Sequence, residues 1–290
     1  MKWFLILFLV LSGCSTRSSI EKLGGSVFTD QNGNIVSVVF GNSRELADSD
    51  LECLKGLNNL VDLKLNYTQV TDAGLVHLKG LTELRSIAFG WAKINGAGLV
   101  YLKGLKNLEG LSFYCTQVTD AGLVHLEGLT KLEFLHFGHT KITDAGLVHL
   151  DELNQLMELK LGGTQVTGAG LVHLAGLKQL EYLDLSDLAV TDAGLVHLDE
   201  LNQLKDLYLD DSQITDSGLV HLTGLRNLES LGLGGNQITD AGLVHLKGMT
   251  NLQSLVLSGT KVTEIGLAVL KRSLPKLRDV TYDRDGTLSE

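Results

Sequence analysis

The pattern of apolar and polar positions repeats every 24 residues along residues 71–270. Its clearest copy starts at Thr71 and reads Thr-Asp-Ala-Gly-Leu-Val-His-Leu. The same core begins again at Asn95, Thr119, Thr143, Thr167, Thr191, Thr215, Thr239 and Thr263. A period of about 20–50 residues is typical of a solenoid, in which each unit covers the apolar face of its neighbour. Because a stack of similar units rarely forms one unique pocket, the pattern weighs against an enzyme.

Each repeat predicts a strand, a corner and a helix. In the first complete copy, Leu63 and Leu65 show the alternation of a short strand. Thr71 is a good N-cap for a helix, and the carboxylate of Asp72 suits the positive end of the helix dipole. Gly80 can supply the left-handed residue that ends the helix. We therefore expect a short strand and a short helix in every repeat.

The full pattern is Leu-x-x-Leu-x-Leu-x-x-(Thr/Asn)-x-(Val/Ile)-Thr-Asp-x-Gly-Leu-x-x-Leu, and it resembles the leucine-rich repeat. The Thr-Asp-Ala-Gly-Leu half is similar to variants found in bacterial repeat proteins and in some F-box proteins. The resemblance implies an α/β fold, a right-handed leucine-rich repeat solenoid with the shape of a horseshoe. It also implies a parallel sheet on the concave face and short helices on the convex face.

The corner of each repeat carries a polar residue in most copies. In the leucine-rich repeat family an asparagine there bonds to the backbone of the neighbouring turn, and Asn236 matches it. Hydroxyl side chains can replace it at Thr68, Thr116, Thr140, Thr164, Ser212 and Thr260. Ala92 and Leu188 cannot, so we expect this polar ladder to be broken at those two corners.

The first residues have the features of a secretion signal. Lys2 is followed by an apolar run too short to span a bilayer as a helix, and then by Leu-Ser-Gly-Cys, which ends at Cys14. This box resembles the lipobox of bacterial lipoproteins, which implies cleavage before Cys14 and lipidation of its thiol. Because Ser15 stands where that family's inner-membrane retention signal has aspartate, the resemblance implies the outer membrane in a Gram-negative host. An ordinary signal peptide cut near Gly13, or a buried apolar segment, is the alternative.

The ends of the array differ from its centre, as the exposed ends of a solenoid require. Residues 26–40 alternate like a hairpin around Asn32-Gly33, a strong two-residue turn signal. Near Pro275 one residue is added, and residues 277–282 predict a last strand. We divide the chain into a signal peptide (1–13), a lipidated cysteine and flexible tether (14–24), a hairpin cap (25–46), leucine-rich repeats (47–282) and a C-terminal tail (283–290).

Composition narrows the possible partners. The formal net charge of −10 weighs against nucleic acid, whose backbone needs clustered Lys and Arg. Cys53 and Cys115 lie at different positions of non-adjacent repeats, so we expect no disulfide between them. No nucleotide loop, catalytic triad or paired-carboxylate signature stands out, and the sequence predicts no cofactor and no metal.

The exposed strand positions vary while the helix side repeats almost unchanged. Aromatic and acidic residues collect at these positions in the middle of the array, where they are typical anchors for a ligand. The candidate ligand-binding residues are Trp91, Tyr114, Phe134, His136, Tyr182, Asp184, Asp206, Tyr208 and Asp210. Their acidity suggests a partner with a basic surface; calcium is the weaker alternative, because no calcium loop is evident. Equally, exposed strand positions can vary simply because nothing constrains them.

Two further groups of residues invite a chemical interpretation. Stacking predicts that Cys115 and His139 lie on neighbouring turns, as a nucleophile pair or half a metal site would require. With no orienting group or oxyanion device identified, we interpret them as part of a bulky rim beside the sheet. The helix side carries histidines at positions 77, 125, 149, 173, 197, 221 and 245, which we interpret as one exposed position copied with each repeat.

These observations predict a non-catalytic binding module, held at the bacterial cell envelope by its lipid anchor, that binds another protein through its concave face. The alternative is a structural envelope protein in which the array is a spacer without a tight ligand. The F-box resemblance suggests a ubiquitin ligase subunit, but residues 1–46 leave no room for an F-box and look secretory.

Overall fold

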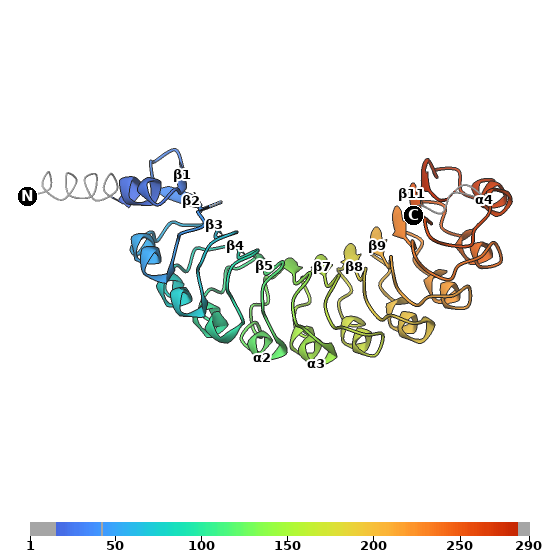
Figure 1. Cartoon of the computed structure of the whole chain (residues 1–290), viewed down its shortest axis with the longest axis horizontal. Coiled ribbons are helices and arrows are strands. Elements are labelled where there is room, and N and C mark those ends of the chain that lie inside the picture. The colour runs from blue at the N-terminus through green and yellow to red at the C-terminus, as the bar shows by residue number, and fades with distance from the viewer. Residues whose placement is uncertain (1–15, 42, 284–290) are drawn as a thin grey trace, which may run out of the picture. The chain divides into compact units, whose positions relative to one another are not determined.

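The computed structural model describes residues 16–41 and 43–283, which belong to two compact units. Unit 1 ends at Leu132 and unit 2 begins at Glu133. Within each unit the strands lie along one side and the short helices along the other (Figure 1). The α/β solenoid predicted from the repeats is confirmed. Below, the two sides are called the strand face and the helix face.

In unit 1 the strands follow one another across the sheet in chain order. They are β1 (Ser26–Thr29), β2 (Ile35–Val39), β3 (Asp62–Lys64), β4 (Ser86–Ala88) and β5 (Gly110–Ser112). The helix face is formed by η1 (Asp48–Leu54), η2 (Asp72–Leu78), η3 (Ala97–Leu102) and α2 (Asp120–Leu123). β1 and β2 are antiparallel and the following pairs are parallel, as expected for a hairpin cap that leads into the repeats.

Unit 2 continues the same alternation with parallel strands. Its strands are β6 (Phe134–His136), β7 (Glu158–Lys160), β8 (Tyr182–Asp184), β9 (Asp206–Tyr208), β10 (Ser230–Gly232), β11 (Ser254–Val256) and β12 (Asp279–Thr281). Its helices are α3 (Asp144–Leu147), η4 (Val148–Leu150), η5 (Gly170–Leu174), η6 (Asp192–Leu198), η7 (Gly218–Leu222), η8 (Gly242–Leu246) and α4 (Glu264–Lys271). Most are 3₁₀ helices, since each repeat leaves room for only one or two turns.

The central leucine of each strand sets the register. Leu63 pairs with Ile87, and Ile87 pairs with Leu111, so corresponding positions of successive repeats lie side by side. All three side chains are buried. At the C-terminal end Leu255 pairs with Val280, one residue beyond a 24-residue step, which confirms the residue added near Pro275. Because side chains alternate along a strand, the residues on both sides of each leucine project from the strand face.

The N-terminal segment differs from the prediction in two ways. Residues 16–22 are helical, where a flexible tether was expected. Ile20 is fully buried and lies close to Phe40, so this helix covers the end of the core. Also, the turn of the hairpin spans residues 30–34 and not two residues, because the carboxylate of Asp30 accepts hydrogen bonds from the amides of Asn32 and Asn34, both at 2.9 Å.

The predicted polar ladder at the corners of the repeats is confirmed at Asn236, whereas the predicted bond to the neighbouring turn is wrong at Thr68. Oδ1 of Asn236 accepts from the amide of Ile214 at 3.0 Å, and its Nδ2 donates to the carbonyl of Leu209 at 2.7 Å, so it does bridge to the neighbouring turn. The Thr68 hydroxyl instead donates to the carbonyl of Leu65 in its own turn, at 2.8 Å. A hydroxyl is shorter than an amide and reaches only the carbonyl three residues earlier.

Asp72 lies in the first turn of its helix as expected, and it has a second role. Its carboxylate accepts from the amides of Asn95, Gly96 and Gly98, which all belong to the next repeat, at 2.7–3.0 Å. The motif aspartate therefore joins repeats to each other, in addition to lying in the first turn of its own helix. Among the described residues, no helix has the length and apolar character needed to cross a membrane. Cys14 lies outside the described residues.

Candidate ligand-binding surfaces

One column of residues, just after each strand, has a left-handed backbone in every repeat. We call it the rim. It carries a side chain at Tyr67, Trp91, Cys115, His139, Asp187 and Asp211, with φ between 52° and 62°, and glycine at Gly163, Gly235 and Gly259. A left-handed residue other than glycine, Asn or Asp costs about 1–2 kcal/mol. The sequence indicated that this column carries bulky side chains, but not that its backbone is strained.

Unit 1 carries three exposed aromatic rings, with Trp91 in contact with both Tyr67 and Tyr114. Tyr67 and Trp91 stack at a centroid distance of 5.9 Å and an interplanar angle of 12°. Trp91 meets Tyr114 edge to face at 6.3 Å and 70°. The three residues are 47%, 51% and 44% exposed. We call this cluster the aromatic ridge; Tyr67 was not among the predicted site residues, although its place in the rim could have indicated it.

Unit 2 carries a connected chain of polar and aromatic side chains along β6 to β9. Nε2 of His136 lies 2.8 Å from Oε1 of Glu158, and Nζ of Lys160 lies 2.7 Å from the same oxygen. The Lys160 ammonium also lies 4.8 Å from the centre of the Tyr182 ring, a cation–π distance. Tyr182 in turn packs on Tyr208 at 5.4 Å. The sequence prediction missed Glu158 and Lys160, which are what link His136 to the tyrosines.

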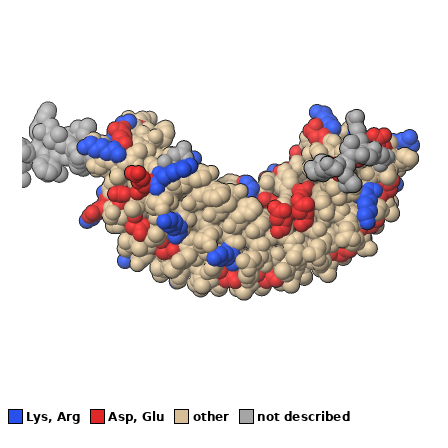
Figure 2. All heavy atoms as spheres, viewed as in Figure 1, with Lys and Arg blue, Asp and Glu red and all other residues tan. Residues whose placement is uncertain are grey.

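Aspartates surround the two tyrosines. Asp184 accepts from the amide of Ser186 at 3.0 Å, and Asp210 accepts from the amide of Gly234 at 2.8 Å. Gly232 of β10 leaves the space that Asp210 and Tyr208 occupy, since a Cβ there would collide with Asp210 and lie in tight contact with Tyr208. Acidic side chains gather near β8 and β9 in the surface view (Figure 2). We call Tyr182, Tyr208, Asp184, Asp206 and Asp210 the acidic patch.

The environment of this patch shifts several protonation equilibria. Burial, together with Tyr208 and nearby carboxylates, raises the pKa of Tyr182, and burial with Asp206 raises the pKa of Tyr208. Burial also raises the pKa of Asp210, against the hydrogen bond from the Gly234 amide. Both tyrosines therefore remain neutral hydrogen-bond donors well above neutral pH.

Beside the patch, the pKa values of His136 and Glu158 are both lowered. Burial lowers the pKa of His136, and the neighbouring Lys160 lowers it further, against the attraction of Glu158. For Glu158, burial opposes ionisation, but the hydrogen bond from Lys160 and the nearby His136 outweigh it and lower the pKa. At neutral pH we therefore expect a neutral imidazole that donates to a carboxylate.

The other predicted positions are placed as follows. Phe134 begins β6 in unit 2 and is 40% exposed. Trp91 and Tyr114 meet in the aromatic ridge of unit 1. The prediction thus comprised members of two surfaces, one in each unit, and these surfaces differ in charge.

Metal-binding clusters and cysteines are the features of the described residues that bear on catalysis. Among them, no group of three His, Cys, Asp or Glu side chains could hold a metal ion. Burial, with the nearby charge of Asp50, raises the pKa of the Cys53 thiol to about 11, so this cysteine is a poor nucleophile near neutral pH. Cys115 and His139 lie in different units.

The helix face is repetitive. Its histidines are partly exposed, and Nδ1 of His173 lies 3.4 Å from Oδ1 of Asp151. The valine before each histidine is exposed in most repeats, as at Val172 and Val196. Burial lowers the pKa of His125. Since these residues recur in most repeats, with Tyr101 and Val269 in place of histidine in two of them, this face varies less than the strand face.

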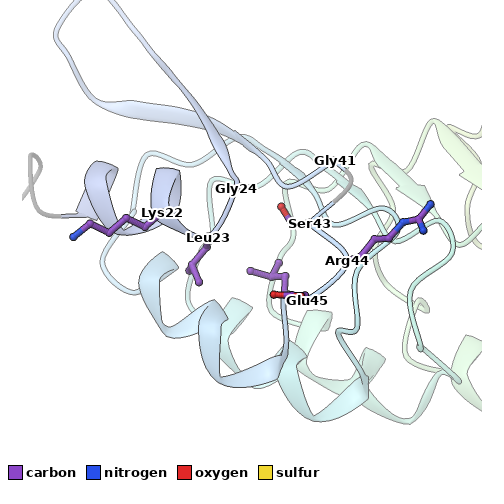
Figure 3. Close-up of a pocket in the computed structure, with 8 residues that line it drawn as sticks. Lys22, Leu23, Gly24, Gly41, Ser43, Arg44 and Glu45 are labelled. Atoms are coloured by element: carbon purple, nitrogen blue, oxygen red, sulfur yellow. The ribbon is translucent and has the colours of Figure 1, made fainter.

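A cleft of about 460 Å³ lies in the N-terminal cap of unit 1 (Figure 3). It is formed between residues 22–24, at the end of the N-terminal helix, and residues 41 and 43–46. Lys22, Arg44 and Glu45 bring charges of both signs to its walls, and the close-up shows the Ser43 hydroxyl between them. The cleft is shallow and open, and its mixed charges favour no particular ligand.

Comparison with known proteins agrees with the repeats. A family model described as leucine rich repeat matches residues 202–262, and a second of that description matches residues 128–150. None of the curated proteins compared with the chain matches it. With these models and the solved structures below, the chain is a leucine-rich repeat protein.

Three solved structures illustrate the likeness. An internalin of Listeria monocytogenes is 27% identical, with a TM-score of 0.66, over 80% of this chain and 70% of its own. An internalin C2 of the same organism is 22% identical, with a TM-score of 0.54, over 93% and 92%. A leucine-rich repeat protein of Leptospira interrogans is 22% identical, with a TM-score of 0.61, over 81% and 62%. Leucine-rich repeat proteins are in general non-catalytic and bind protein partners.

Proposed function

We propose that the chain is a non-catalytic binding module that binds a protein partner through the acidic patch of unit 2. The observation that carries the proposal is the packed pair Tyr182 and Tyr208, held on adjacent strands among three aspartates. Aromatic side chains at the centre of a polar surface are typical hot spots for protein binding. The shape of the patch is held by the contacts described above, so little ordering is needed on binding.

The charge of the patch favours a basic partner. Asp184, Asp206 and Asp210 lie beside the tyrosines, and the chain carries a formal net charge of −10. Carboxylates on an exposed surface attract cationic groups at long range and speed association. A basic protein surface presents Lys and Arg side chains that can pair with the carboxylates and lie over the tyrosine rings, as Lys160 already does on one side.

We also propose that the protein is anchored at the bacterial cell envelope by lipid on Cys14. The support is the sequence Leu-Ser-Gly-Cys after a charged start and an apolar run. Two or more acyl chains provide stable anchoring, which one chain does not. In the native host, Cys14→Ala should give a protein that no longer incorporates labelled palmitate. Equal labelling of the variant and the parent would contradict the anchor.

A capture experiment with variants tests the binding function. The full chain, the double variant Tyr182→Ala/Tyr208→Ala and the helix-face control His173→Ala/His197→Ala are immobilised and exposed to envelope extracts. Proteins captured by the parent and the control, but lost with the tyrosine variant, are purified and their direct binding is measured. We expect such a protein to bind less tightly at high salt. If every captured protein is lost only with the helix-face variant, the strand face is not the binding surface; if no protein binds, the spacer alternative is favoured.

A further inference from the structure

The aromatic ridge of unit 1 is not part of the core. The core of the same repeats has its own stacked pair, Phe89 and Phe113, both fully buried with centroids 5.5 Å apart. The rings of Tyr67, Trp91 and Tyr114 lie outside that layer and remain about half exposed.

The backbone gives a second reason to look for a ligand. Tyr67 and Trp91 have φ values of 59° and 62°, a conformation that glycine adopts at much lower cost. At the same position of later repeats the chain does use glycine, as at Gly163, Gly235 and Gly259. The fold therefore tolerates glycine here, and the two bulky rings add strain that the architecture does not require. Strain of this kind is common at functional sites.

The strand face beside the ridge is uncharged on β4 and β5, while β3, which leads to Tyr67, carries Asp62 and the exposed Lys64. Its outward residues on β4 and β5, with the glycine that follows β4, are all small: Ser86, Ala88, Gly90, Gly110 and Ser112. Gly90 is buried, and a Cβ there would lie 2.9 Å from Oδ1 of Asn66 and 3.5 Å from the carbonyl of Tyr114. The Asn66 side chain therefore lies over Gly90, and its amide group borders the small floor residues next to the rings.

The chemistry of this surface selects among ligands. Phosphate and sulfate groups need cations, and a basic peptide needs carboxylates, but these five floor residues are uncharged. A sugar ring has apolar C–H faces that pack on aromatic rings, and hydroxyls that bond to serine hydroxyls, to the Tyr phenols and to the Trp indole N–H. Small floor residues let a flat chain of such rings approach the backbone.

We propose that the aromatic ridge and its floor form a binding site for a neutral glycan chain. The site is separate in chemistry from the acidic patch of unit 2, which selects cationic groups. Trp91 stacks on a sugar ring, Tyr67 and Tyr114 extend the contact to neighbouring rings, and Ser86 and Ser112 bond to hydroxyls. Binding is insensitive to salt, because no charge pair is formed.

The site contains its own reporter. The chain has two tryptophans, Trp3 and Trp91, so the variant Trp3→Phe leaves Trp91 as the sole tryptophan. This full-length variant is titrated with neutral hexasaccharides of different linkage, among them cellohexaose, chitohexaose and mannohexaose. At least one is expected to change Trp91 emission in a saturable way, equally at low and high salt. A hexalysine peptide should leave the emission unchanged.

Glycine variants test the ridge without disturbing the backbone. Tyr67→Gly and Trp91→Gly each remove a ring where the backbone favours glycine, so the fold is retained; circular dichroism checks this. Calorimetry should show at least about tenfold weaker glycan binding in each, and unchanged binding in the acidic-patch control Tyr182→Ala. The proposal would be overturned if no hexasaccharide changed the emission, or if both glycine variants bound glycan as tightly as the parent. It would also be overturned if a protein partner required the ridge while no glycan bound.

Discussion

The carboxylate of Asp192 accepts two hydrogen bonds from Thr215, one from the backbone amide at 2.8 Å and one from the hydroxyl at 2.6 Å. Thr215 begins the Thr-Asp core of the following repeat, so the bond pair joins two neighbouring turns. The same pair of bonds joins Asp48 to Thr71, Asp144 to Thr167, Asp216 to Thr239 and Asp240 to Thr263.

This relationship explains the glycine of the motif. A Cβ at Gly218 would collide with the Asp192 carboxylate, so the glycine makes the space in which the aspartate of the preceding repeat lies. In two repeats the aspartate is replaced by Gly96 or Gly168. Gly168 lies directly against Gly194 of the following repeat. The Thr, Asp and Gly of the Thr-Asp-x-Gly sequence therefore form the contacts between neighbouring repeats.

The first prediction tests this contact with two matched threonines. Thr215→Ala removes the hydroxyl that bonds to Asp192 and caps the helix turn through the Ser217 amide at 3.3 Å. We expect a loss of about 1–3 kcal/mol in the free energy of unfolding, measured by denaturant titration. Thr191→Ala should cost less than about 0.5 kcal/mol, because its preceding partner position is Gly168 and its side chain makes no cap bond. Equal losses would contradict the role of the carboxylate.

The second prediction concerns the strained rim. Cys115 has a φ of 55°, so Cys115→Gly relieves about 1–2 kcal/mol of backbone strain. The gain is partly offset by about 0.5–1 kcal/mol, since glycine makes the unfolded chain more flexible. We expect unfolding stability to be unchanged or up to about 1 kcal/mol higher. In contrast, Gly259→Ala, at a φ of 72° and with little space beside Gly235, should lower it by at least about 1 kcal/mol. A clear loss in Cys115→Gly would show that the thiol side chain supports the fold.

The third prediction is that the tyrosines of the acidic patch determine binding affinity, whereas its aspartates determine the rate of association. Once a protein partner is available, Tyr182→Ala with Tyr208→Ala should weaken binding by at least about 1–2 kcal/mol, mainly through faster dissociation. Asp184→Asn with Asp206→Asn should instead slow association and flatten its salt dependence, as exposed charges usually do. Surface plasmon resonance at several salt concentrations separates the two effects. Slower association in the tyrosine variant alone would reverse this assignment.

The fourth prediction follows from the raised pKa of Tyr182. The folded state holds its phenolic proton more tightly than the unfolded chain, whose tyrosines ionise near pH 10. This contribution to stability is fully present below the unfolded pKa and is lost as the pH rises through the folded pKa. The melting temperature should therefore fall as the pH rises above about 10, and fall less in Tyr182→Phe.

Ultraviolet titration of the phenolate provides the matching control. In the folded protein part of the tyrosine absorbance should appear only at higher pH than in guanidinium, and Tyr182→Phe should remove a portion of that late change. If all tyrosines of the folded protein ionise together near pH 10, the packing of Tyr182 against Tyr208 is looser than described.

The sequence by itself determined the architecture. The 24-residue spacing placed Leu63, Ile87 and Leu111 in register, because identical units stack only with equivalent positions side by side. It also indicated the hairpin cap, the residue added near Pro275 and the bridging role of Asn236. It indicated that aromatic and acidic residues collect on the strand face, because variable positions stand out when the frame around them repeats.

Only the tertiary structure decided which contacts join the repeats and what each surface offers. Asp72, a charge in the first turn of its helix, also binds the next repeat; Ile20, in a polar segment, covers the core. The strained backbone of Trp91 and the contact of Lys160 with Tyr182 are likewise invisible in the linear order. The physical reason is the same in each case. Local propensity depends on neighbours along the chain. These residues interact instead with partners about one repeat away, which come close only when the turns stack.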